Sequence, residues 1–146
     1  MQTKYLLTIL LALGLTLPAH ARDDKADYSI AEALEAPAAK EKLDQDIKLY
    51  FGKQKHPKAS KALGEWKTNK KTNGFNKSDQ EACEWTFLSA VLELQERARK
   101  EGGNAVVGIV SNYRNVETSS DTTFVCGSGA LMSGVALKGK VVKLGK

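Results

Sequence analysis

The chain has 146 residues, with 22 Lys or Arg against 17 Asp or Glu, which gives a formal net charge of +5. Apolar residues make up 42 % and charged residues 27 % of the chain, as is typical of a globular domain. With 12 Gly, 3 Pro and no repeat, the composition excludes collagen-like, mucin-like and coiled-coil architectures, and the length favours one domain over a multi-domain enzyme.

Residues 1–21 have the three parts of a secretory signal peptide. Lys4 supplies the positive charge, residues 5–17 are almost wholly apolar, and residues 19–21 form a small-x-small cleavage site. The apolar run is shorter than the roughly 20 residues of a membrane-spanning helix. The alternative interpretation is a buried N-terminal helix. We therefore expect an exported protein that starts near Arg22, without a lipid anchor because no Cys follows the cleavage site.

The first part of the exported chain is acidic and predicts short helical turns followed by a strand. Residues 22–46 carry eight acids against four bases, a net charge of −4. Ser29 and Glu32 form a capping box for a helix over residues 29–43, which Pro37 splits in two. Residues 47–51 predict a strand that ends at Gly52.

A lysine-rich stretch follows. Residues 47–77 hold nine Lys and one acid, Glu65, so that their net charge is +8. Residues 53–77 are polar and lack a strong hydrophobic period, apart from a short possible strand at 62–68. We expect this stretch to be mostly an irregular loop within the single domain over residues 22–146.

The strongest predicted element is a helix over residues 78–100. Ser78 and Glu81 form a second capping box, and Gly102 with Gly103 supplies the C-terminal stop. Apolar residues recur at helical spacing and form one stripe for packing on a sheet. The stripe consists of Cys83, Phe87, Ala90, Val91, Leu94 and Ala98.

Strands are predicted after this helix. Residues 105–110 are β-branched, residues 111–121 are polar and predict a hairpin loop, and a second strand begins at 122–126 and continues into 131–137. Gly139 predicts a further turn before a last strand at 141–144. Glycines at 127, 129, 134 and 139 permit bulges or close approach of the helix. The sum is an α+β fold, with one long helix and a second short one on a mostly antiparallel sheet.

The exported part contains two cysteines, Cys83 and Cys126. An even number in an oxidising compartment predicts a disulfide, which would tie the first turns of the long helix to the sheet. The closed loop of about 44 residues is worth roughly 4 kcal/mol in the chain-entropy model. The alternative is two separate buried thiols. Two Cys and two His at these spacings form no zinc pattern.

The sequence holds few candidate catalytic residues. His20 lies in the predicted signal peptide, and His56 lies among lysines, as expected for an exposed loop residue. A Cys–His pair would need a free thiolate, which the disulfide removes. The chain has no P-loop and no G-x-S-x-G, and residues 127–129 are typical of a Gly-rich strand or turn. We expect no cofactor and no enzyme activity; the alternative is a small periplasmic enzyme with a carboxylate- or Lys-based site.

The lysines are the main candidates for a binding function. They could meet polyanions such as lipopolysaccharide, teichoic-type polymers or nucleic acid, of which nucleic acid is not favoured because Arg, the usual residue for bidentate phosphate recognition, is lacking. Phe51, Trp66 and Phe75 are interleaved and could stack or pack. The alternative is a solvated loop. Besides Lys48, the candidates are Lys53, Lys55, Lys58, Lys61, Lys67, Lys70, Lys71 and Lys77.

Trp85 lies off the apolar stripe of the long helix. A Trp in this position is either a second core contact or an aromatic that faces a partner. Because large aromatic side chains are highly buried on average, we expect a core position.

One motif resembles known families. The motif consists of Ala98 and residues 102–107, Gly-Gly-Asn-Ala-Val-Val. It resembles the corresponding motif of YbjQ-type domains and of the periplasmic domain of the Rcs stress-sensing lipoprotein. Residues 124–130, around Cys126, also resemble the Cys-containing strand of the Rcs sensor. The chain from residue 22 resembles small exported Gram-negative proteins that carry the label "excinuclease ATPase subunit". The shared residues are Tyr50-Phe51-Gly52, Lys70-Lys71-Thr72-Asn73, Cys83, Cys126 and Val135-Ala136-Leu137-Lys138-Gly139.

The resemblance implies a β-α-β-β core whose helix is tied to the sheet by a disulfide between Cys83 and Cys126. It does not carry the families' activities over. The chain lacks the P-loops and zinc cysteines of an excinuclease ATPase, and the lipid Cys and four cysteines of the Rcs sensor. The YbjQ group is sometimes called heavy-metal-binding, but this chain has no matching cluster of metal ligands.

We therefore expect a non-enzymatic, periplasmic or secreted binding protein whose partner is an envelope protein or a polyanion. A contiguous lysine patch on a flat surface favours binding, and a deep cleft with convergent acids of raised pKa favours an enzyme. Lysines scattered in space favour an accessory role.

Overall fold

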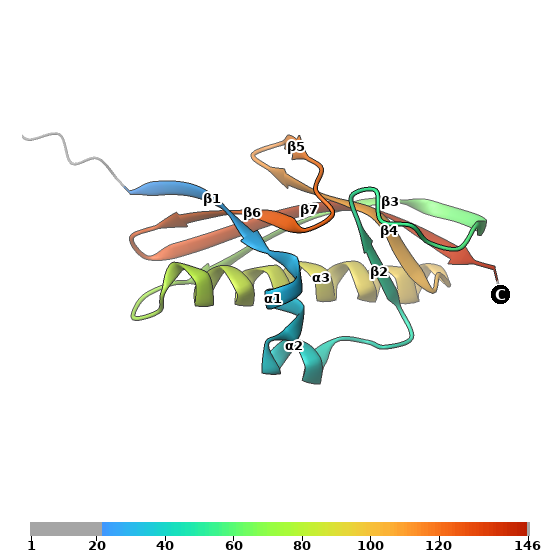
Figure 1. The fold of residues 1–146 in the computed structure, drawn as a ribbon, viewed down its shortest axis with the longest axis horizontal. Helices are drawn as coiled ribbons and strands as arrows, with labels where there is room; N and C mark the ends of the chain where they lie inside the picture. Colours follow the sequence, from blue (N-terminus) through green and yellow to red (C-terminus); the bar gives the residue numbers. More distant parts are fainter. Residues whose placement is uncertain (1–21, 146) are drawn as a thin grey trace, which may run out of the picture.

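The computed structural model describes residues 22–145, so the predicted signal peptide lies outside the described residues. In chain order, β1 and two short helices come first, β2 and β3 precede one long helix, and the remaining strands follow it (Figure 1). The elements are β1 (Asp23–Ser29), α1 (Ile30–Glu35), α2 (Pro37–Lys42), β2 (Lys48–Phe51), β3 (Ala59–Asn73), α3 (Asp79–Glu101), β4 (Ala105–Tyr113), β5 (Val116–Thr118), β6 (Thr123–Gly129) and β7 (Met132–Leu144).

The seven strands described within residues 22–145 belong to one sheet, which is organised around β7. Strand β3 pairs with one edge of β7 along its whole length, while β6 and β4 share the other edge. Strand β1 pairs with β6, and both β2 and β5 pair with β4. Every pairing is antiparallel except that of β2 with β4. The predicted α+β class is confirmed, but the sheet is larger than the small one we expected.

The long helix forms as predicted and covers one face of the sheet (Figure 1). Ser78 caps it, since its hydroxyl accepts the N–H of Glu81 at 3.1 Å, and Gly102 ends it in the left-handed conformation at φ 78°. Every residue of the predicted apolar stripe is buried. The stripe packs on Val106, Leu137 and other inward-facing residues of the sheet.

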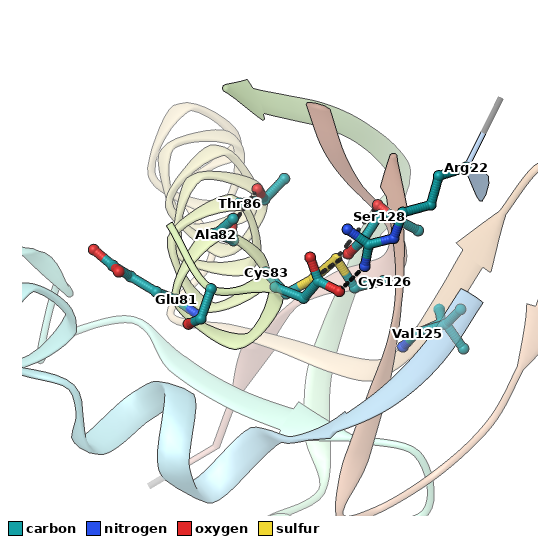
Figure 2. The surroundings of a disulfide bond; sticks show 12 residues. Arg22, Glu81, Ala82, Cys83, Thr86, Val125, Cys126 and Ser128 are labelled. Carbon is teal, nitrogen blue, oxygen red and sulfur yellow. Dashed lines mark hydrogen bonds and ion pairs between the residues drawn. A yellow bond between two sulfur atoms is a disulfide. The ribbon is translucent and has the colours of Figure 1, made fainter. Parts of the chain in front are cut away.

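The disulfide between Cys83 and Cys126 is present and links the start of α3 to β6 (Figure 2). Both cysteines are fully buried, and the hydroxyl of Ser128 lies 3.3 Å from the sulfur of Cys83. At the same end of α3, Arg22 forms an ion pair with Asp79 (Figure 2). A buried structural disulfide is typical of proteins from oxidising compartments.

The short helices and the strand predicted for the N-terminal segment are present. Ser29 caps α1 through the N–H of Glu32 at 3.2 Å, and the helical run breaks before Pro37, which starts α2. Strand β2 lies where residues 47–51 predicted it. Strand β1 was not predicted, because its charged residues show no apolar alternation. None of the helices described within residues 22–145 is long and apolar enough to cross a membrane.

The prediction of a loop over residues 53–77 is wrong for most of its length. Ala59–Asn73 form the 15-residue strand β3, whereas the sequence suggested only a short strand at 62–68. An edge strand with one open face can keep polar side chains on that face, so its hydrophobic period is weak. Irregularities near Lys61 and Leu63 shift the register and obscure the period further.

Two further corrections concern the C-terminal strands. Residues 122–137 do not form one continuous strand, because Ala130 and Leu131 separate β6 from β7. Gly139 lies within β7 and is not a turn. A Cβ there would lie 2.6 Å from Cγ1 of Val106 and 3.2 Å from Cγ1 of Ile109, so the glycine allows close packing beneath α3.

Gly139→Ala should therefore lower the free energy of unfolding by about 1 to 3 kcal/mol, because buried neighbours that cannot swing away resist the added methyl group. The measurement is urea unfolding followed by circular dichroism. Gly134→Ala, in the same strand, is the matched control, since its new Cβ would meet neighbours only at 3.7 Å or more. Equal losses in both variants would contradict the packing argument.

Candidate anion-binding groove on the open face of the sheet

The face of the sheet opposite α3 carries a groove with a floor of small residues. Val135 and Leu137 pack in the core against α3, so the alternate residues of β7, Gly134 and Ala136, face the other way. Gly127 of β6 lies beside Gly134 in the register. Because this floor has almost no side chains, a groove of about 330 Å³ remains above it.

The ring of Tyr113 forms one wall of the groove. A Cβ on Gly127 would lie 1.8 Å from the Tyr113 hydroxyl oxygen, so the ring occupies the space that a side chain would need. Tyr113 ends β4, and the next two residues, Arg114 and Asn115, have φ values of 52° and 61°. Two consecutive positive φ values are typical of the tight turn that reverses a chain into a hairpin, here from β4 to β5.

The charged and polar side chains of the groove come from three strands or their ends. Lys71 and Asn69 extend from β3, Arg114 follows β4, and Asp23 starts β1. Arg114 forms an ion pair with Asp23, which raises the pKa of the guanidinium through a hydrogen bond and through charge attraction. Its guanidinium carbon lies 5.3 Å from the centroid of the Tyr113 ring, at the distance of a cation–π contact.

The groove therefore presents two cations and one carboxylate around a neutral floor. Lys71 is exposed and has no ion pair among residues 22–145. An ammonium group and a fixed guanidinium are the groups that sulfate, phosphate and carboxylate groups prefer. The groove can thus bind one anionic group of a ligand, with the Tyr113 ring as an apolar contact.

More positive charge lies next to the groove on the same face. In the register of β3 and β7, Lys67 faces Lys138 and Glu65 faces Lys140. Lys138 is neutralised by ion pairs with Glu65 and Glu117. Lys67 and Lys140 have no ion pair within the described residues, so they continue the positive charge of Lys71 along β3 and β7.

The structure does not bring the eight predicted lysines together. Lys67 and Lys71 share the open face, but Lys70 lies on the α3 side, where it forms an ion pair with Glu93. Strand β3 alone is about 50 Å long at roughly 3.3 Å per residue. The remaining predicted lysines lie in the β2–β3 loop, at the start of β3 or beyond its end; they are Lys53, Lys55, Lys58, Lys61 and Lys77.

The aromatic residues named in the sequence do not form one surface with the lysines. Phe51 is in the core, Trp66 stacks under Arg97 at 5.4 Å, and Phe75 is 61 % exposed. His56 lies in the β2–β3 loop against the ring of Tyr50. The core prediction for Trp85 is wrong: its exposed fraction is 45 %, and it lines a surface pocket between α3 and the short helices α1 and α2.

Two observations bear on catalysis and metal binding. Within the part of the chain that the structure describes, no three His, Cys, Asp or Glu side chains group as metal ligands. Two carboxyls have shifted pKa values, and both are lowered: Asp44 by a hydrogen bond from Arg99, and Glu96 by one from Lys100. Ionised, solvated carboxylates of this kind do not act as general acids at neutral pH.

Sequence reasoning did not find Tyr113 and Arg114 as site residues. The sequence signal for them is weak: Arg114 and Asn115 lie in a polar stretch that predicts a hairpin, and glycines at 127 and 134 are also expected at bulges or at a close approach of the helix. Only the pairing of β6 with β7 places these glycines side by side under Tyr113.

No known family model, no characterised protein and no solved structure matches this chain. The resemblance to exported Gram-negative proteins stays a prediction, and the groove is interpreted on its own geometry.

Proposed function

We propose that the protein is a non-enzymatic binding protein of the bacterial envelope that holds an anionic polymer across the open face of its sheet. The single observation that carries the proposal is the groove over Gly127 and Gly134, bordered by Lys71 and Arg114. It combines the Tyr113 ring, which lies over the glycine floor, with two cations that recognise an anionic group.

The arrangement of the other lysines supports a polymer over a single small anion. Lys67 and Lys140 lie on the same face as the groove and are not neutralised by described carboxylates. A chain with repeated sulfate, phosphate or carboxylate groups can contact several of these cations at once and releases counterions as it binds. A single small anion would contact only the cations of the groove and would leave Lys67 and Lys140 without a role.

The location follows from the predicted signal peptide together with the disulfide. Cys83 and Cys126 form a buried bridge, which fits an oxidising compartment, and the periplasm is the proposed one. The proposed ligands are therefore polyanions of the envelope, such as lipopolysaccharide. Nucleic acid is used only as a comparison ligand in the binding test.

The test is retention on a heparin matrix of the oxidised protein, exported by an expression host and purified from its periplasm. We expect elution only at several hundred millimolar salt. Lys71→Gln/Arg114→Gln should elute at clearly lower salt, because it removes both cations of the groove. Retention on immobilised lipopolysaccharide and on DNA then compares the two polyanions.

Lys55→Gln/Lys58→Gln is the matched control. It removes the same charge from the β2–β3 loop, away from the groove. If the salt concentration at elution falls equally for both double variants, binding depends on net charge and the groove is not a specific binding site. Elution of the unaltered protein near physiological salt would contradict the proposal as a whole.

A further inference from the structure

Strand β3 is an unusually long open edge. Among residues 22–145 it pairs with β7 alone, so its other side has no strand partner. Its register with β7 is unbroken from Gly64 to Asn73, which makes this stretch straight and regular. A regular open edge of this length is a template for a further strand.

The direction of the free backbone groups can be assigned. Gly74, one residue past β3, donates its N–H to the carbonyl oxygen of Leu131 at 2.7 Å and so continues the ladder with β7. Because backbone groups alternate along a strand, the even-numbered residues of β3 face β7 and the odd-numbered ones face outward. The residues whose N–H and C=O groups point outward are therefore Glu65, Lys67, Asn69, Lys71 and Asn73, of which the carbonyl oxygen of Asn73 accepts a hydrogen bond from Nζ of Lys77.

A groove between β3 and α3 borders this edge. It has a volume of about 390 Å³ and is lined on one side by Trp66 and Thr68 of β3, and on the other by Leu92 and Glu96 of α3. A strand added to β3 would lie about 4.8 Å beyond it, above this groove. Alternate side chains of such a strand would point into the groove towards α3.

The hydroxyl of Thr68 is a second, independent observation. Thr68 is only 5 % exposed, and its Oγ1 has no hydrogen-bond partner among the described residues. A buried polar atom without a partner costs free energy, and the residue that carries it, Thr68, lines the groove. A polar side chain of an added strand would supply the missing partner.

The charges around the edge select an acidic partner. Strand β3 contains four lysines and one acid, Glu65. In the groove, Lys70 pairs with Glu93, Lys100 with Glu96 and Arg97 with Glu101. Lys67 is the one lining cation without an ion pair among residues 22–145, and Lys71 adds a second unpaired charge on the same edge. Opposite charges across an added strand are favourable, whereas a second copy of β3 would bring Lys against Lys.

We propose that the free edge of β3 binds an extended, acidic polypeptide segment of a partner protein by β-strand addition, with alternate side chains in the groove between β3 and α3. The odd-numbered backbone groups hold the segment, and Lys67 and Lys71 meet its carboxylates on the open face. This surface meets the groove over Gly127 at Lys71, but it differs from that groove in using the backbone of the edge and the flank of α3.

The test uses fluorescein-labelled pools of peptides of about ten residues, long enough to cover the regular part of β3, with Glu or Asp at alternate positions and random residues between them. We expect the acidic pool to bind the full exported protein in fluorescence anisotropy and a pool with Lys at the same positions not to bind. Bound peptide should also slow amide hydrogen exchange at residues 65–73.

Asn69→Pro separates backbone pairing from simple charge attraction. It removes one outward N–H but none of the bonds to β7, a position where an edge strand tolerates proline, and Asn69→Ala is its matched control. We expect a loss of at least about tenfold in affinity for the proline variant and little change for the alanine variant. Circular dichroism should be the same for both variants. Because Asn69 also lines the groove over Gly127, heparin retention is compared between the two variants and should be equal, so that a loss of peptide binding in the proline variant alone is separated from the proposed polymer site.

Three results would overturn the proposal. The first is an acidic pool that does not bind. The second is equal affinity of Asn69→Pro and Asn69→Ala, which would mean that side-chain charge alone attracts the peptide. The third is a concentration-dependent dimer that Asn69→Pro disrupts, which would assign the edge to a second copy of this chain.

Discussion

Phe87→Ala should lower the free energy of unfolding by about 3 to 5 kcal/mol, the range of Phe-to-Ala changes in protein cores. Phe87 is 1 % exposed and lies at the centre of the aromatic part of the core. Its ring stacks on Phe124 with centroids 4.2 Å apart and contacts Phe51 at 5.8 Å. Removing it leaves a cavity between α3, β2 and β6 that these rings cannot fill. Urea unfolding at 25 °C measures the loss.

Phe75→Ala is the control for this prediction. It deletes the same atoms from a side chain that is 61 % exposed in the turn between β3 and α3, so the expected change is within about 0.5 kcal/mol. Comparable losses in the two variants would show that the cluster around Phe87 does not form the core.

Loss of the disulfide should have an effect of similar size. Cys83 and Cys126 are 43 residues apart, and the chain-entropy model gives about 4 kcal/mol for closing such a loop. Cys83→Ala/Cys126→Ala removes the bridge without leaving a free thiol in the core. We expect its midpoint of urea unfolding to fall well below that of the oxidised protein.

Dithiothreitol provides the control for the bridge. It should destabilise the unaltered protein to a similar extent and leave the double variant unaffected. A variant as stable as the oxidised protein would mean that packing around α3, not the covalent link, holds the helix on the sheet.

The elements that could be predicted from sequence are those whose signals are local. Ser78, the apolar stripe of α3 and Gly102 lie within one segment, and each marks a start, a face or an end. Pro37 splits α1 from α2 in the same local way. The disulfide could be predicted from the even number of cysteines and the oxidising compartment that the predicted signal peptide indicates. These features depend on spacing along the chain and not on what lies across the fold.

Strand β3 shows why the rest could not be predicted. Its partner β7 is separated from it by the whole of α3, β4, β5 and β6, and that pairing turns a polar, lysine-rich stretch into a strand. In the sequence Gly139 predicts a turn, and only the packing of Val106 and Ile109 against it explains why a glycine lies within β7. The groove likewise exists only once β6 and β7 are paired and Tyr113 lies above Gly127.

The position of β7 has a consequence for how the chain folds during synthesis and export. Strand β3 has no other strand partner in residues 22–145, so residues 59–73 stay unpaired until residues 132–144 have emerged. An unpaired strand of this length is a hazard for aggregation during that interval. The four lysines of β3 act against it, because like charges keep the strands of different nascent chains apart. The charge of β3 thus protects the chain before folding, whatever it binds afterwards.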